Sequence, residues 1–387
     1  MPLQAPSPDT VKAAPDLRIL GGGLSGLLTA WRVTHVNPHL VVEVVERSDR
    51  LAGDHTWSFN DSDIAPELRD WLAPFVAHRW DRYDVRFPER ERTLEIGYRT
   101  GHSGTLRSAV QPLIEAGRIR VRLGATRGEG DIPTLDATGF APRDDEVPGW
   151  QKFVGRVIET AEPHGVAHPV IMDATVEQLD GYRFIYLLPF SDRELLVEDT
   201  YFSDGPNLSE NEIGARIDDY VRERGWADHR IVRTEKGVLP MMMATDRNDD
   251  SARIGLGGGF AVAATGFTVP HAVEVADVVA QVVKRDGPAA APAAVAAFRR
   301  THIRRERYAR LLNRMFFRAA EPHRRFIVLQ RFYGLREGLI RRFYRNGLTP
   351  CDKARILIGK PPVPVSRALA NFSESRFLRR ERQGKPQ

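Results

Sequence analysis

Two adjacent carboxyl side chains, Glu198 and Asp199, lie near the end of a strand-like segment, residues 194–202. Successive side chains of a strand point to opposite faces, so the two acids belong to different faces. Apolar residues occupy both faces, which indicates a strand that is buried on both sides. Burial raises the pKa of a carboxyl group, and a second acid nearby raises it further. We therefore expect Glu198 to stay protonated near pH 7 and to act as a general acid, with Asp199 tuning it.

The same residues allow a structural interpretation, in which the acid at the strand end pairs with a base such as Arg183. Other catalytic machinery is absent from the sequence, because there is no CxxC, no GxSxG and no histidine or cysteine spacing typical of a metal site. We therefore predict no metal. The single cysteine, Cys351, excludes a disulfide framework, which favours a cytoplasmic protein.

The element that must position this chemistry is a dinucleotide-binding unit at residues 17–46. A short apolar strand leads into a glycine-rich turn, an amphipathic helix and a second strand. Gly21 permits the tight turn, Gly23 lets the backbone approach a pyrophosphate, and Gly26 lets the helix pack against the strand. Glu46 ends the second strand, where a carboxylate can accept hydrogen bonds from a ribose. The alternative is a glycine turn that only packs. By analogy with the layout of flavoproteins, a unit at the start of the chain favours FAD over NAD.

Two later glycines are predicted to lie against the same cofactor. Gly139 ends a short strand that closes in Ala-Thr-Gly, where small residues let the backbone come close to a ligand. Gly266 lies in a further glycine-rich turn that leads into a helix at residues 271–284. We expect this second turn to close over the flavin end of FAD.

These patterns predict an α/β fold with a Rossmann-like FAD-binding lobe of the glutathione-reductase-like flavoprotein type, an inserted mixed α+β substrate lobe and a helical C-terminal region. The length of 387 residues suffices for two lobes. The expected divisions are a disordered lead-in (1–15), a discontinuous FAD-binding lobe (16–52, 96–145 and 236–286), a substrate lobe (53–95 and 146–235), a basic and aromatic helical region (287–375) and a disordered tail (376–387).

The positive charge of the chain is concentrated between residues 299 and 345, where fifteen arginines face three acids. Such a patch suggests an anionic membrane surface or nucleic acid, and the alternative is a solvated helical face. Nothing in the segment resembles a base-reading module, so we predict no nucleic-acid partner. No apolar stretch reaches the ~18 residues needed to span a bilayer. We expect this region to face a membrane, with its arginines and with the aromatic residues Phe316, Phe317, Phe326, Phe332, Tyr333, Phe343 and Tyr344.

From about Leu17 to Val365, the sequence resembles the bacterial lycopene β-cyclases. Glu198 falls on the essential acidic position of that family, and Asp199 on its acidic neighbour. The chain departs from the family pattern at Asp54, where asparagine is usual, and at residues 260–270, which replace a loop carrying His-Pro-Thr-Thr-Gly-Tyr. The resemblance is carried by GDHTWSF (53–59), PHG (163–165), IMDATV (171–176), GYRF (181–184), LLVEDT (195–200), RFY (331–333), IRRFY (340–344) and GKPPVP (359–364).

The resemblance implies a proton-initiated cyclisation of lycopene, through a monocyclic carotenoid, to β-ionone rings. A hydrocarbon offers no site for a nucleophile, so a buried, protonated Glu198 would start the reaction at a terminal double bond. The family uses reduced FAD beside the resulting carbocation, with NAD(P)H as the reductant and no net redox change. Trp57 and Phe59 are the candidates for a cation-stabilising aromatic wall.

Because lycopene lives among lipid tails, we expect peripheral, monotopic attachment to the inner face of the cell membrane, beside other enzymes of carotenoid synthesis. Two other classes remain open from the residues. A redox flavoenzyme, such as a monooxygenase or a prenyl reductase, would share the nucleotide lobe but would consume NAD(P)H and would not need Glu198. A non-catalytic carotenoid or lipid carrier would keep the basic surface but would have no use for a reduced flavin.

Overall fold

The computed structural model describes residues 14–246, 250–358 and 363–383. The predicted lead-in therefore lies almost wholly outside the described residues, as do the first four residues of the 359–364 motif and the last four of the chain. No helix in the described ranges combines the length and the apolar character needed to cross a membrane.

A four-stranded parallel sheet forms from the predicted dinucleotide unit and two later strands, in the order β8-β2-β1-β9. Helix α1 follows the glycine turn, as predicted. The elements are β1 (Leu17–Leu20), α1 (Leu24–Val36), β2 (Val42–Glu46), α3 (Ser103–Glu115), β8 (Ile119–Leu123) and β9 (Thr134–Asp136). The predicted Rossmann-like lobe is confirmed.

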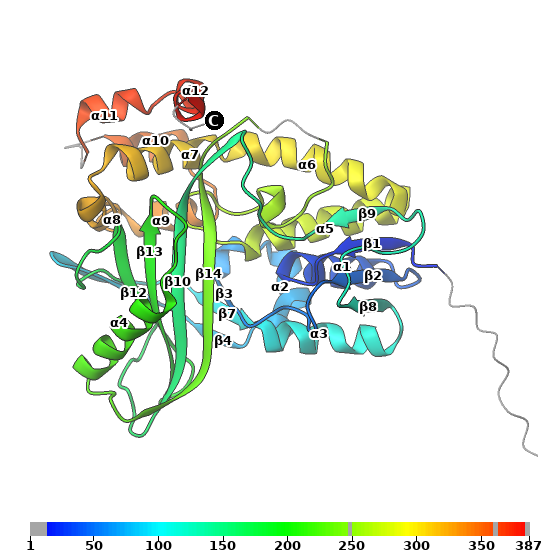
Figure 1. Cartoon of the computed structure of the whole chain (residues 1–387), viewed down its shortest axis with the longest axis horizontal. Coiled ribbons are helices and arrows are strands. Elements are labelled where there is room, and N and C mark those ends of the chain that lie inside the picture. Colours follow the sequence, from blue (N-terminus) through cyan, green and yellow to red (C-terminus); the bar gives the residue numbers. More distant parts are fainter. Residues whose placement is uncertain (1–13, 247–249, 359–362, 384–387) are drawn as a thin grey trace, which may run out of the picture.

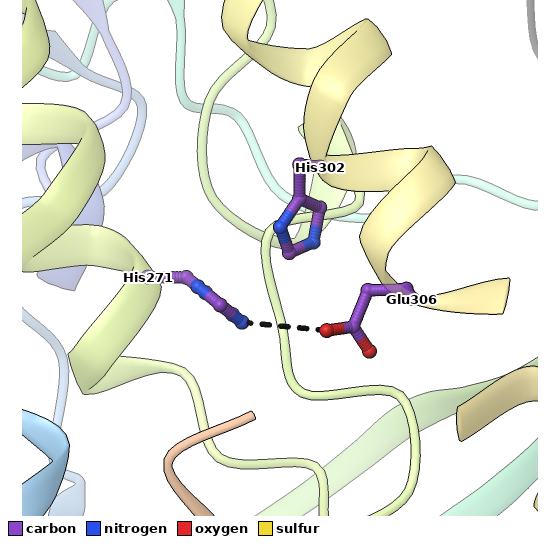
Figure 2. A group of neighbouring side chains, drawn as sticks. All are labelled: His271, His302 and Glu306. Atoms are coloured by element: carbon purple, nitrogen blue, oxygen red, sulfur yellow. Dashed lines mark ion pairs between the residues drawn. The ribbon is translucent and has the colours of Figure 1, made fainter. Parts of the chain in front are cut away.

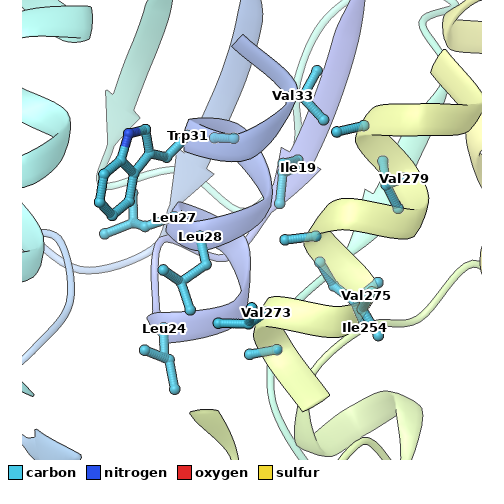
Figure 3. Packing of buried hydrophobic residues seen from close by; sticks show 14 of the residues in the cluster. Ile19, Leu24, Leu27, Leu28, Trp31, Val33, Ile254, Val273, Val275 and Val279 are labelled. Carbon is cyan, nitrogen blue, oxygen red and sulfur yellow. The ribbon is translucent and has the colours of Figure 1, made fainter. Parts of the chain in front are cut away.

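Helix α5 (Val269–Asp286) packs along α1, although more than two hundred residues separate them in the chain. Figure 3 shows their side chains meeting over the sheet, with Leu28 and Val33 of α1 on one side and Val275 and Val279 of α5 on the other. This contact brings the glycine-rich turn before α5 to the edge of the sheet where the first glycine turn lies.

A larger sheet of seven strands carries the second lobe, in the order β14-β10-β13-β12-β11-β5-β6. Its interior strand β13 is hydrogen-bonded on both edges, and apolar clusters cover both of its faces. Helix α4 (Glu210–Glu223) covers one face. The strands are β5 (Tyr83–Phe87), β6 (Arg90–Leu94), β10 (Glu146–Thr160), β11 (Val170–Asp173), β12 (Tyr182–Pro189), β13 (Glu194–Ser203) and β14 (His229–Thr245). The expectation of a strand buried on both faces is correct.

A small antiparallel sheet, in the order β3-β7-β4, lies between the two larger ones and packs on helix α5. It consists of β3 (Thr56–Asn60), β4 (His78–Trp80) and β7 (Tyr98–His102). Helix α2 (Pro66–Leu72) lies between β3 and β4 in the sequence. Short 3₁₀ turns occur at Asp61–Asp63, Ala73–Phe75, Leu256–Gly258, Pro288–Ala290 and Pro322–Arg324, and a π turn occurs at Met315–Ala319.

The rest of the chain is helical, as predicted, and runs along one side of the molecule (Figure 1). The helices are α6 (Ala291–Arg305), α7 (Arg307–Arg314), α8 (Arg325–Phe332), α9 (Glu337–Tyr344), α10 (Pro350–Leu357), α11 (Val365–Ala370) and α12 (Glu374–Gln383).

Helix α12 corrects the prediction of a disordered tail from residue 376. Phe377 and Leu378 are buried in the core of the second lobe, and Glu374 forms an ion pair with Arg310 at 2.6 Å. Two apolar residues in a charge-rich segment are enough to anchor it, which its composition does not reveal.

The predicted outward-facing aromatic surface is wrong. Phe316, Phe317, Tyr333 and Tyr344 belong to the core of the second lobe, and the other three aromatic residues of this region pack against it. Several of its arginines are buried too, and Arg314 donates hydrogen bonds to backbone carbonyls. Side chains that we expected to be exposed therefore pack the C-terminal helices against the large sheet.

Candidate functional site

A cavity of about 710 Å³ extends from the first glycine turn to the face of the large sheet. The cavity lies where three parts of the molecule meet. These are the ends of the parallel strands, the segment before α5 and the interior strands of the large sheet. Seven of the ten predicted site residues line it, namely Gly21, Gly23, Glu46, Trp57, Gly139, Glu198 and Gly266. Gly26, Phe59 and Asp199 do not.

The glycine turn leaves room where a phosphate would have to approach. Gly21 has φ +102°, and a side chain there would lie 2.4 Å from the Ala137 carbonyl oxygen. Gly23 caps α1, and a Cβ on it would meet no protein atom within 4 Å, so the space in front of the helix is open. A Cβ on Gly26 would come within 2.0 Å of the Gly21 carbonyl oxygen, so this glycine serves close packing.

Glu46 is held as an ionised acceptor at the end of β2. It accepts hydrogen bonds from the backbone amides of Gly22 at 2.7 Å and Ser48 at 2.8 Å. Although burial alone raises the pKa of Glu46, these amides more than offset it and leave the pKa below its ordinary value. A carboxylate with unused lone pairs therefore faces the cavity, which suits a ribose hydroxyl.

Gly139 and Gly266 also line the cavity, and both have positive φ, at +96° and +73°. A side chain on Gly266 would come within 2.4 Å of the Gln151 Oε1 atom. That oxygen is buried and accepts no hydrogen bond from any described residue. Gln151 also lines the cavity, so it offers an acceptor for a ligand donor.

Glu198 projects from β13 into the cavity and is buried. Its Oε1 atom accepts a hydrogen bond of 2.6 Å from the Thr200 hydroxyl. Burial, and then the nearby Glu235 and Asp199 carboxyls, raise the pKa of Glu198 to about 8, with Thr200 opposing them. This acid therefore carries its proton at neutral pH.

Asp199 points to the other face of the strand, away from the cavity. Arg183 donates hydrogen bonds to it from Nε at 2.9 Å and from Nη2 at 3.0 Å, and the Tyr201 hydroxyl donates another. Burial raises the pKa of Asp199, although Arg183 opposes the rise. The structural interpretation therefore applies to Asp199, while Glu198 keeps the cavity-facing position.

Glu235 is a buried acid of the site that sequence reasoning missed. Strand β10 lies between β13 and β14, and its Gly155 is in register with both Glu198 and Glu235. A Cβ on Gly155 would lie 3.2 Å from Glu235 Cγ and 3.4 Å from Glu198 Cβ. The glycine thus leaves a gap in which the two acids face each other. Only the strand register could have revealed this pair.

Glu235 is itself paired. Arg233 donates a hydrogen bond to its Oε2 atom, and the Thr56 hydroxyl donates another at 2.9 Å. The Glu235 carboxyl disfavours a negative charge on Glu198 beside it, which is one cause of the raised pKa of Glu198.

The aromatic wall of the cavity differs from the predicted one. Trp57 lines it, whereas Phe59 is buried in the core of the nucleotide lobe. Tyr186 donates a hydrogen bond of 2.8 Å to the Ser58 hydroxyl, and its own hydroxyl lies 2.9 Å from that of Tyr98. The cavity is also lined by Tyr98, Phe153, Phe184, Tyr186, Phe202, Phe267 and Tyr344.

The sequence has clear relatives. A family model described as "Lycopene cyclase protein" matches residues 16–131 and 132–370. The lycopene beta-cyclase of Paracoccus sp. (strain N81106 / MBIC 01143) is 39% identical over 386 residues, which cover 94% of this chain and 98% of the relative. That of Pseudescherichia vulneris is 37% identical over 91% of this chain and 96% of its own.

Solved structures share the fold at low identity. A geranylgeranyl bacteriochlorophyll reductase-like protein from Thermoplasma acidophilum superposes with a TM-score of 0.60 at 12% identity, over 93% of this chain and 99% of its own. The flavin-dependent brominase Bmp2 gives 0.56 at 11% identity, over 95% and 98%. These likenesses concern the fold alone.

Proposed function

The chain belongs to the lycopene cyclase family, and we propose that it closes the ends of lycopene into β-ionone rings by a proton-initiated reaction with no net redox change. The observation that carries this proposal is Glu198, a buried carboxyl with a raised pKa that faces the same cavity as the dinucleotide turn. A monocyclic carotenoid would be the intermediate product.

FAD is the cofactor that fits the cavity. The open space at Gly23 and the positive end of α1 would receive the pyrophosphate, and Glu46 would accept from the ribose. Gly139 and Gly266 leave room along the wall toward Glu198. Bound there in its reduced form, with NAD(P)H as the source of electrons, FAD supplies negative charge beside a developing cation.

Glu198 would donate its proton to a terminal double bond of lycopene, leaving a tertiary carbocation on the neighbouring carbon. The next double bond attacks that carbon and closes the ring, and loss of a ring proton to a carboxylate gives the β-ionone end group. One proton is added and one removed, so the product is an isomer of the substrate.

The lining of the cavity suits such a cation. Trp57, Phe184 and Tyr186 line the same cavity as Glu198, and an aromatic face is worth about 1–2 kcal/mol to a desolvated cation. The apolar wall also keeps water from capturing the cation. The Glu235 carboxyl also lines the cavity and raises the pKa of Glu198, which favours its protonated form.

The direct test is expression of the chain in cells that accumulate lycopene, followed by analysis of the pigments. We expect cyclic carotenoids to replace lycopene. A redox flavoenzyme would instead give hydroxylated or reduced pigments, or leave lycopene unchanged, and would consume NAD(P)H in proportion to product.

We also propose that the chain attaches to a membrane, because lycopene has to reach the cavity from a bilayer. The end of α10 and helix α11 expose a group of large apolar side chains, and Leu369 is 71% exposed. Helix α11 lies at the outer edge of the molecule (Figure 1). Exposed apolar groups of this kind suit insertion into the interface of a membrane. We call Leu357, Ile358, Val365, Leu369 and Phe372 the apolar edge.

A further inference from the structure

Three side chains that are distant in the sequence converge in the interior beside the cavity (Figure 2). His271 lies in the first turns of α5, His302 near the end of α6, and Glu306 at the junction of α6 and α7. They are 6%, 1% and 3% exposed. One ligand-type atom of each lies within 4.8 Å of the corresponding atoms of the other two.

Both histidines keep a nitrogen atom without a hydrogen bond. Nε2 of His271 and Nδ1 of His302 are buried, and neither has a hydrogen-bond partner among the described residues. The His271 Nε2 atom lies 3.8 Å from Glu306 Oε1, which is too far for a hydrogen bond. Two unsatisfied nitrogens in one buried place are costly, and a shared ligand would remove the cost.

The remaining atoms of the three side chains are held by neighbours. The other nitrogen of His271 lies 3.2 Å from Glu274 Oε2, and that of His302 lies 3.0 Å from the Gly259 carbonyl oxygen. Glu306 Oε2 accepts a hydrogen bond of 2.9 Å from the Ala263 amide. Metal-binding histidines characteristically donate their second N–H to a carboxylate or a carbonyl in this way.

We propose that His271 Nε2, His302 Nδ1 and Glu306 Oε1 bind a divalent metal ion of the zinc type. Two imidazole nitrogens and one carboxylate oxygen form a known protein ligand set for Zn²⁺, with water as the fourth ligand. A separate cavity of about 40 Å³, lined by His302 and Glu306, has room for that water. Glu306 Oε1 also accepts a hydrogen bond from Asn346, which leaves it a lone pair for the metal.

The ligand atoms would have to move closer together. Bonds of about 2.0–2.2 Å place tetrahedral ligands about 3.3–3.6 Å apart, so a separation of 4.8 Å would have to shrink by about 1.2–1.5 Å. Rotation of the three side chains can supply this without a change in the helices.

The role of the ion would be structural. Gly259 and Ala263, which hold His302 and Glu306, lie in the segment that continues into residues 265–268 of the cavity wall. A metal would therefore clamp α5, α6 and this segment together behind the proposed flavin site. Sequence spacing could not predict the group, because His271 comes from a different helix.

The test uses the full-length chain with its bound flavin, incubated with excess Zn²⁺ and then freed of unbound metal. We expect about one zinc per chain by elemental analysis. His302→Gln and Glu306→Gln should each weaken zinc binding at least tenfold, whereas His323→Gln, on an exposed side chain, should bind as the unsubstituted chain does. Flavin content and circular dichroism report whether the variants fold.

Cobalt provides a measurement that needs no variant. Co²⁺ in the unsubstituted chain should give the visible absorption of a four-coordinate site, without the thiolate charge-transfer band that binding at Cys351 would add. A folded chain that stays metal-free in excess Zn²⁺ and Co²⁺ would overturn the proposal. So would full zinc content in both ligand variants, or a cobalt spectrum dominated by thiolate. Metal content does not depend on cyclase activity, so this proposal and the proposed function can fail separately.

Discussion

At the scale of single residues, the neighbouring acids Glu198 and Asp199 have different roles because their side chains lie on opposite faces of the same strand. Asp199 is neutralised by Arg183 in the core, while Glu198 faces a cavity with its proton retained. The sequence predicted the raised pKa from burial and alternation. It could not predict which acid would meet Arg183, or that Glu235 would approach across Gly155, because both depend on strand register.

Removing the charge of Glu235 should change the pH dependence of the reaction. Protonated Glu198 is the active form, so activity should fall as the pH rises through about 8. Glu235→Gln removes a negative neighbour, so the pKa of Glu198 should fall and the descending limb should move to lower pH, by about one unit. The measurement is initial rate against pH. A profile with an unmoved limb would show that Glu235 has only a structural role.

Glu198 should also make the fold less stable at high pH. Its pKa is about 8 in the folded chain and about 4.3 when unfolded, so the unfolded state loses its proton first as the pH rises. The stability that its protonated form contributes is present below pH 4.3 and is lost up to about pH 8. Glu198→Gln should therefore melt at a higher temperature than the unsubstituted chain at pH 8, with a smaller difference at pH 5. Equal differences at both pH values would contradict the raised pKa.

At the scale of elements, the β-α-β unit was predictable because its residues are contiguous and each glycine has a local reason. The large sheet was only partly predictable. Its strands carry clear apolar patterns, yet the position of β10 between β13 and β14 follows from pairings between residues 35 to 99 positions apart in the chain. The aromatic helices misled the prediction, since buried and exposed aromatic residues look alike in sequence.

The same substitution at two glycines of the glycine-rich motif should have different effects. Gly23→Ala places a methyl group in space that no protein atom occupies, so the fold should persist while flavin affinity falls about tenfold or more, which corresponds to ~1.4 kcal/mol. Gly26→Ala drives a methyl group into the Gly21 carbonyl and should lower the melting temperature of the flavin-free chain. Flavin titration and thermal melting of both variants are the measurements. Unchanged flavin affinity in Gly23→Ala would move the phosphate site elsewhere.

At the scale of the whole molecule, we propose the apolar edge as the membrane contact, because the aromatic residues of the arginine-rich helices are packed in or against the core. The double variant Leu369→Glu and Phe372→Glu should reduce co-sedimentation with liposomes several-fold. The reason is that charges would replace two exposed apolar side chains that insert into the membrane interface. Leu123→Glu is the matched control, since Leu123 is also exposed but lies on β8. An equal loss in the control, or none in the double variant, would exclude the apolar edge as the docking surface.

The central claim is that Glu198 donates the proton that starts cyclisation. The most direct measurement is turnover of lycopene by Glu198→Gln, which keeps the shape of the side chain but removes its acidic proton. With reduced flavin bound, its rate should fall by about 10²–10⁴-fold or more, the share that a general acid contributes. Glu194→Gln, at the start of the same strand, should keep its activity. Near-normal turnover by a flavin-loaded Glu198→Gln chain would contradict the account.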